Sequence, residues 1–140
     1  MARHFKTLFL VMVVSLLLAG CTPPFEERFD GELSVASDFD LDSVGKVAFI
    51  DPHGGGLTPS GLNYFIEGED VMEKLESALA TAGFIQSPVS DLGRQWQRDS
   101  EGLLQTVQAE PFAEGDTFTS GTDGDDTTYV SQDKGVQVSL

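Results

Sequence analysis

The stretch "GEDVMEKLESALATAGF", residues 68–84, carries the strongest structural pattern in the chain. Its apolar residues recur at spacings of three and four, which is the period of one face of an α-helix; they are Val71, Met72, Leu75, Ala78, Leu79 and Ala82. Gly83 stands where a left-handed residue commonly ends a helix. The pattern predicts a helix of about fourteen residues, from about Glu69 to Ala82, with its apolar face against a sheet.

Strand signals lie on both sides of this helix. Val44, Val47, Phe49 and Ile50 indicate a buried strand before it. The segment "DPHGGGLTPSG", residues 51–61, is expected to be a loop, because glycines and prolines interrupt regular structure. After the helix, Phe84 and Ile85 are expected to pack on the core and open a second strand.

The last third of the chain suggests further strands, which are "GRQWQRD" (93–99), "LLQTVQAEPF" (103–112), "TTYVSQ" (127–132) and "GVQVSL" (135–140). The final two are expected to form a closing hairpin, with its turn at residues 133–135. A strand, a helix and then several strands predict an α+β fold. We expect a small, mostly antiparallel sheet with one main amphipathic helix packed on it.

The N-terminus indicates export. Arg3 and Lys6 precede the run "LFLVMVVSLLL", residues 8–18, which is too short to span a bilayer and is typical of a signal peptide. The residues Leu18-Ala19-Gly20-Cys21 resemble the lipobox of bacterial lipoproteins. That resemblance implies cleavage between Gly20 and Cys21 and acylation of Cys21, whose chains would bind the membrane.

These signals divide the chain into three parts. Residues 1–20 are the predicted lipoprotein signal peptide, residues 21–32 the lipidated cysteine with an acidic tether, and residues 33–140 a single α+β domain. Thr22 follows the cysteine, whereas lipoproteins retained in the inner membrane often carry aspartate there. We therefore expect an anchor in the outer membrane, with the domain facing the periplasm.

The charge balance excludes some partners. The chain has 8 basic and 23 acidic residues; without Arg3 and Lys6 the remainder carries a formal charge of −17. Such acidity argues against nucleic acid and anionic headgroups as partners. Cys21 is the only cysteine, so no disulfide is expected to support the fold.

Part of the sequence resembles a family of small Gram-negative lipoproteins that carry a domain of unknown function. The similarity rests on the pair Asp38-Phe39, on Val47-Ala48-Phe49, and on a helix from Leu75 that closes with glycine and Phe84. It covers roughly residues 33–85. The resemblance implies an envelope protein without an established activity, and the lipidated cysteine is the one functional residue that it transfers.

One segment suggests a metal site. "FIDPHGGG", residues 49–56, resembles the zinc-binding "IDPGHGG" of cell-wall amidases, with Asp51 orienting a zinc-bound His53. However, no glycine separates Pro52 from His53. Catalytic zinc also needs about three protein ligands, and His53 is the only histidine after residue 20. A metal-dependent cell-wall hydrolase built on Asp51 and His53 is therefore the alternative function, and a glycine-rich connection is the favoured interpretation.

Two other groups are weaker candidates. Asp123, Asp125 and Asp126 supply oxygen atoms that calcium could use, but their spacing does not match an EF-hand loop, and a solvated turn is favoured. Trp96 could stack on a ligand, although a core position is favoured for a single aromatic residue in a strand.

The sequence thus predicts a non-enzymatic, lipid-anchored envelope lipoprotein with no cofactor. Its small domain would present a surface to another envelope protein or help to maintain the envelope.

Overall fold

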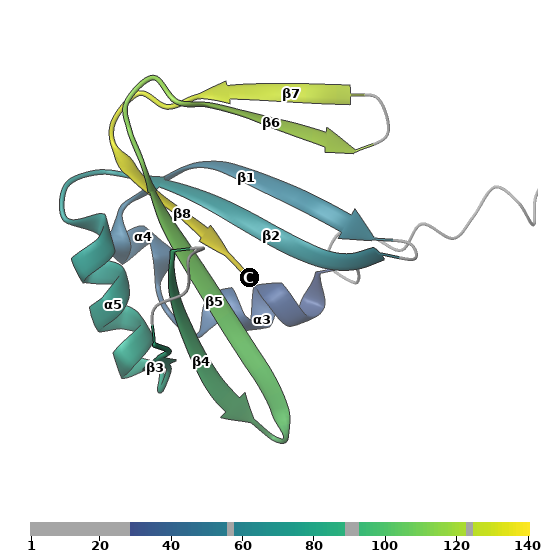
Figure 1. The fold of residues 1–140 in the computed structure, drawn as a ribbon, viewed down its shortest axis with the longest axis vertical. Helices are drawn as coiled ribbons and strands as arrows, with labels where there is room; N and C mark the ends of the chain where they lie inside the picture. The colour runs from purple at the N-terminus through teal and green to yellow at the C-terminus, as the bar shows by residue number, and fades with distance from the viewer. Residues whose placement is uncertain (1–28, 56–57, 89–92, 123–124) are drawn as a thin grey trace, which may run out of the picture.

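The computed structural model describes residues 29–55, 58–88, 93–122 and 125–140 (Figure 1). Its helices are α3 (Asp30–Ser37), α4 (Leu41–Val44) and α5 (Val71–Thr81). Its strands are β1 (Lys46–Gly55), β2 (Thr58–Glu67), β3 (Ile85–Gln86), β4 (Arg94–Ser100), β5 (Leu103–Phe112), β6 (Thr117–Thr122), β7 (Asp125–Val130) and β8 (Gly135–Ser139). The predicted signal peptide and Cys21 lie outside the described residues.

Six strands form one sheet in the order β1-β2-β8-β5-β4-β3, and every neighbouring pair is antiparallel. The last strand, β8, lies in the middle of the sheet, between β2 and β5. Gly135 begins β8 at a point where a Cβ atom would overlap the backbone oxygen of Ile66. The close approach of β8 to β2 therefore requires glycine there.

The expected fold class is wrong. The structure is mostly β, since its strands contain more than twice as many residues as its helices, and it is not a small sheet under one main helix. The described helices are short, with 8, 4 and 11 residues. The helix pattern of residues 68–84 was the clearest local signal, but strands paired over long sequence distances determine the architecture.

Helix α5 is shorter than expected, and Gly83 follows its end in the left-handed conformation that was predicted. It spans Val71–Thr81, so its ends differ from the predicted ones by one or two residues. Gly83 has a φ of +85°. Its N–H bonds the oxygen of Ala80 at 3.1 Å, and the N–H of Phe84 bonds that of Leu79 at 2.9 Å, which together form a Schellman motif.

The helices cover one face of the sheet. From the helices, the core receives Val35, Val44, Val71, Leu75 and Leu79. From the sheet it receives the side chains that point to that face, namely Leu62, Tyr64, Ile66, Trp96, Val107, Ala109, Val136 and Val138. Burial of this cluster is the main contribution to folding. The expected burial of Trp96 is confirmed, at 3% exposure.

The opposite face of the sheet carries the β6–β7 hairpin, as Figure 1 shows. Phe118 of β6 lies 4.4 Å, between ring centroids, from Phe65 of β2. Tyr129 of β7 stacks on Phe49 of β1 at 5.2 Å. The expected hairpin between residues 127–132 and 135–140 is therefore wrong, because β7 pairs with β6 while β8 pairs with β2 and β5.

The predicted loop at residues 51–61 is also wrong, since β1 extends to Gly55 and β2 starts at Thr58. Pro52 is opposite Leu62, and Leu62 exchanges both backbone hydrogen bonds with Leu140 of the chain end beyond β8. Because bonding directions alternate along a strand, the nitrogen of Pro52 points to the outer edge. The proline therefore costs the sheet no hydrogen bond.

Several strand predictions are confirmed. Strands β4 and β5 coincide closely with residues 93–99 and 103–112. In β8, Val136 and Val138 alternate with half-buried neighbours as expected. Ile85 begins β3, but it does not pack on the core, since it is 76% exposed. Residues 30–32, assigned to the tether from sequence, form the first turn of α3.

Candidate functional site

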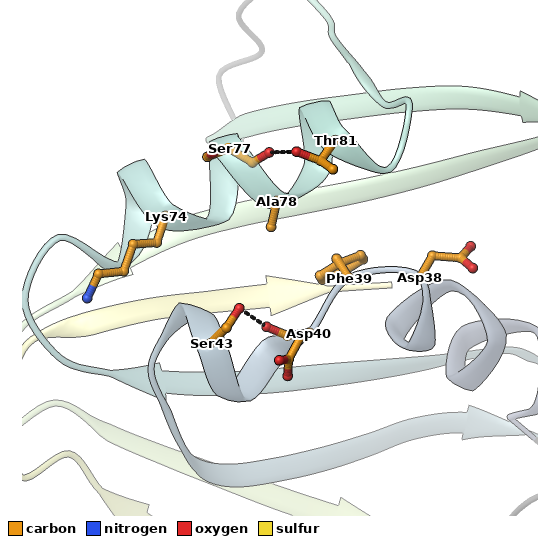
Figure 2. A pocket seen from close by; sticks show the side chains of 8 residues that line it. All are labelled: Asp38, Phe39, Asp40, Ser43, Lys74, Ser77, Ala78 and Thr81. Atoms are coloured by element: carbon orange, nitrogen blue, oxygen red, sulfur yellow. Dashed lines mark hydrogen bonds between the residues drawn. The ribbon is translucent and has the colours of Figure 1, made fainter.

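Two hollows flank the link between α3 and α4 and share Phe39 and Asp40. The first lies against α5 and has a volume of about 400 Å³ (Figure 2). Its residues are Asp38, Phe39, Asp40, Ser43, Lys74, Ser77, Ala78 and Thr81. The second lies between the two helices and β1 and measures about 640 Å³.

The first hollow is lined mainly by polar groups that already bond to nearby backbone. The hydroxyl of Ser43 donates to the Asp40 carbonyl at 2.7 Å, and that of Thr81 donates to the Ser77 carbonyl at 2.9 Å (Figure 2). Lys74 donates to the Glu69 carbonyl at 3.1 Å. These contacts hold the helix surfaces in place, so the first hollow has few groups left to orient a ligand.

The second hollow, here called the β1 groove, is mainly apolar. Ala36, Leu41, Val47 and Ile50 contribute to its lining, and Ile50 is 43% exposed. Its acidic residues are Asp40 and Asp42, both exposed. An exposed aliphatic side chain beside acidic groups suits the binding of another chain better than chemistry on a small molecule.

Tyr64 also lines the β1 groove and is only 5% exposed. Burial, with a further contribution from the negative charge of Glu32, raises the pKa of the Tyr64 hydroxyl. The hydroxyl therefore stays protonated at neutral pH.

Arg98 stabilises the α3–α4 link from the sheet side. Its guanidinium forms an ion pair with Asp38 and donates to the Ala82 carbonyl at 2.8 Å. It also lies 4.5 Å from the ring centroid of Phe84, which in turn makes an edge-on contact with Phe39 at 6.4 Å. The residues Asp38-Phe39 and Phe84, on which the lipoprotein resemblance rests, thus have structural roles in packing the helices onto the sheet.

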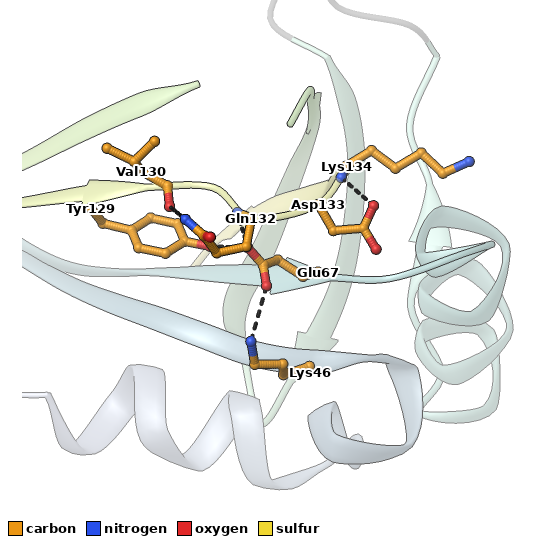
Figure 3. A network of polar contacts seen from close by, with 7 residues as sticks. All are labelled: Lys46, Glu67, Tyr129, Val130, Gln132, Asp133 and Lys134. Carbon is orange, nitrogen blue, oxygen red and sulfur yellow. Dashed lines mark hydrogen bonds and ion pairs between the residues drawn. The ribbon is translucent and has the colours of Figure 1, made fainter. Parts of the chain in front are cut away.

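A second polar cluster surrounds the buried carboxylate of Glu67 (Figure 3). Glu67 Oε1 accepts hydrogen bonds from the Tyr129 hydroxyl and, at 2.6 Å, from the backbone N–H of Gln132. Glu67 Oε2 lies 3.2 Å from Lys46 Nζ. One side chain of β2 therefore joins β1, the β6–β7 hairpin and the segment that leads into β8.

These contacts shift the pKa of the Glu67 carboxyl and of the Tyr129 hydroxyl. Burial alone would raise the pKa of Glu67, but the bonds from Tyr129, Gln132 and Lys46 outweigh it and leave that pKa below the ordinary value. Burial and the Glu67 carboxylate both raise the pKa of Tyr129. The pair is thus held as a carboxylate and a neutral phenol. No buried side-chain polar atom in the described residues lacks a hydrogen-bond partner, and the bonds to Glu67 hold the hairpin against the sheet.

Asp51 and His53, the two residues of the predicted zinc site, both lie on β1, but their side chains make different contacts. Asp51 of β1 accepts a hydrogen bond from the Asn63 amide at 3.4 Å, and Ser139 of β8 donates to Asn63 at 2.7 Å. His53 is exposed, and its ring covers Gly61, where a Cβ atom would collide with it. Asp51 is therefore part of a polar row across β1, β2 and β8.

Among the residues that the structure describes, no group of three or more His, Cys, Asp or Glu side chains is placed to hold a metal ion. Of the calcium candidates, Asp123 lies outside these residues, while Asp125 and Asp126 begin β7. Within the same part of the chain, no helix is long and apolar enough to cross a bilayer.

Sequence reasoning missed both the β1 groove and the Glu67 cluster. Nothing in the local sequence indicates that Asp40, Asp42 and Ile50 line one groove, or that Ile50 stays exposed. A better signal existed for Glu67, because a single acid ends the apolar run "LNYFIE", residues 62–67. Its partners at residues 46, 129 and 132 could only be identified from the tertiary structure.

No family model, curated protein or solved structure matches this chain.

Proposed function

We propose that this protein is a lipid-anchored lipoprotein of the bacterial envelope, attached to the outer membrane, whose domain binds another envelope protein and catalyses no reaction. The lipobox-like residues Leu18-Ala19-Gly20-Cys21 carry the proposal. Acyl chains on Cys21 would hold the protein at the membrane, since two or three chains anchor firmly.

The start of the fold supports an anchor at this position. Phe29 is 1% exposed, and its backbone oxygen accepts a bond from Leu33 at 2.8 Å in the first turn of α3. A chain extends at most about 3.5 Å per residue. The eight steps from Cys21 to Phe29 thus limit the distance from anchor to domain to roughly 28 Å. An acylated Cys21 would keep the α3 end of the domain close to the membrane.

A binding role is supported by the β1 groove. A mainly apolar hollow that is also lined by two exposed carboxylates offers area and charge to a partner chain. The Glu67 cluster fixes the neighbouring strands in place, so this surface is preformed, which lowers the entropy cost of binding.

Metabolic labelling tests the anchor. The full-length protein and a Cys21→Ala variant are expressed in a Gram-negative host with radioactive palmitate, and the membranes are fractionated. We expect label in the unaltered protein alone, in the outer-membrane fraction. Absence of label from both proteins would remove the basis of the proposal, whereas label in the inner membrane would correct the location only.

A further inference from the structure

We infer that the β1 groove binds an apolar segment of a partner protein that is flanked by lysine or arginine side chains. This inference rests on the proposed function and specifies the docking surface and the chemistry of the partner.

The shape of the groove favours an extended peptide. The groove lies at an outer edge of the six-stranded sheet, because β1 pairs with β2 alone among the strands of the described residues. The backbone of Ile50 points to this outer edge, since Asp51 and Phe49 are the positions that bond to β2. A peptide lying along β1 would meet the exposed Ile50 side chain and backbone groups able to pair with a strand.

The charge of the groove favours a basic peptide. In the described residues, all five lysines and arginines donate to oxygen atoms of their own chain, four of them to a carboxylate. Asp40 and Asp42 have no ion-pair partner within that same part of the chain. Their negative charge is thus available to a cation supplied by another molecule.

Pro52 and the acidic residues of the groove disfavour two other occupants, a second copy of the chain and anionic lipid headgroups. Pro52 follows two residues after Ile50 and offers no N–H to a neighbouring strand. Pairing along this edge is therefore confined to a short stretch around Ile50, which an extended peptide can use without a long partner strand. Two acidic groups at the groove would also oppose the same groups of a second copy, as well as anionic lipid headgroups.

The test uses the purified full chain in a neutral detergent and a fluorescein-labelled peptide of alternating lysine and leucine. A peptide of alternating glutamate and leucine serves as the control for charge. Fluorescence anisotropy measures the dissociation constant for the unaltered protein, for an Asp40→Asn/Asp42→Asn double variant, and for Ile50→Asn. Asp133→Asn is the matched control, because it removes an exposed charge next to β8 and far from the groove in sequence. Circular dichroism verifies that each variant folds.

We expect saturable binding of the lysine peptide and none of the glutamate peptide. The double variant should weaken binding about fivefold, as the loss of two exposed ion pairs implies. Ile50→Asn should weaken it about tenfold through lost apolar contact, and Asp133→Asn should leave it unchanged.

The inference would be overturned by an absence of saturable binding, by equal binding of the glutamate peptide, or by equal weakening with Asp133→Asn. A dimer in sedimentation that Ile50→Asn dissociates would also overturn it, since the groove would then hold a second copy. The anchor is judged separately by palmitate labelling. A labelled protein that does not bind the peptide refutes the groove alone, and an unlabelled protein that binds it refutes the anchor alone.

Discussion

The buried carboxylate of Glu67 allows a quantitative prediction about stability. Replacing it by Gln keeps the shape but removes the charge that strengthens the bonds from the Tyr129 hydroxyl and the Gln132 N–H. The amide oxygen can still accept both bonds. Hydrogen bonds to charged groups contribute about 1.5–3 kcal/mol each, against roughly 1 kcal/mol for neutral ones. The Lys46 ion pair adds little, because the Lys46 side chain is 72% exposed.

We therefore expect Glu67→Gln to lower the free energy of unfolding by about 2 kcal/mol at pH 7. Trp96 is the only tryptophan and is buried, so its fluorescence reports unfolding in urea. With a slope of about 1.5 kcal/mol per molar urea, the midpoint should fall by roughly 1.3 M. Glu110→Gln removes the same charge from an exposed side chain of β5 and should change the midpoint hardly at all.

The sign of the pH dependence follows from the pKa of Glu67, which folding lowers from its ordinary value of 4.5. The stability due to the carboxylate is fully present above that ordinary value and is lost as the pH falls through the lower pKa of the folded state. The difference in stability between the unaltered protein and the Glu67→Gln variant should thus be constant from about pH 5 to 7 and shrink below about pH 4. A loss equal to that of Glu110→Gln, or one independent of pH, would refute the reasoning.

Three further predictions address other parts of the molecule. Gly135→Ala should destabilise the protein by about 3 kcal/mol or prevent folding, because its Cβ would overlap the Ile66 oxygen; Gly31→Ala, which has open space in α3, should be neutral or slightly stabilising in the same urea titration. Phe118→Ala should cost about 2 kcal/mol and reduce the near-ultraviolet circular dichroism, since the half-buried ring contacts Phe65 and Phe112. His53→Ala should leave the metal content unchanged when elemental analysis compares it with the unaltered protein, and stoichiometric zinc that this variant loses would instead restore the hydrolase hypothesis.

Local sequence patterns predicted most of the individual helices and strands, but they did not predict how the strands pair in the sheet. The 3.6-residue period of residues 71–82 located α5, and Gly83 located its end, because both depend on interactions within a few residues. Alternation located β8 for the same reason. The strand from Thr58 to Glu67 does not follow these patterns, since its side chains from Leu62 to Glu67 are mostly buried on both faces and its start lies in the segment expected to be a loop.

Pairing of strands could not be predicted from such patterns. Strand β8 follows β7 after four residues, which suggests a hairpin, yet it pairs with β2 and β5 instead. The apolar side chains on its helix-facing side, Val136 and Val138, are buried only in the centre of the sheet. Hydrophobic burial over long sequence distances therefore outweighed the short connection.

The candidate site was equally dependent on tertiary structure. Asp40, Asp42 and Ile50 are close in sequence, but their common groove exists because α3 and α4 pack beside the edge strand β1. Glu67 can hold the β6–β7 hairpin to the sheet because Lys46, Tyr129 and Gln132 reach it from three other segments of the chain.

The sequence by itself determined the acidic charge and the position of the main helix, and it predicts an export and anchoring signal, since each depends on composition or on contacts between near neighbours. The tertiary structure alone decided the six-stranded sheet, the hairpin on its second face and the groove at its edge. These features depend on which distant residues share a buried surface, and the free energy of that burial is a property of the whole fold.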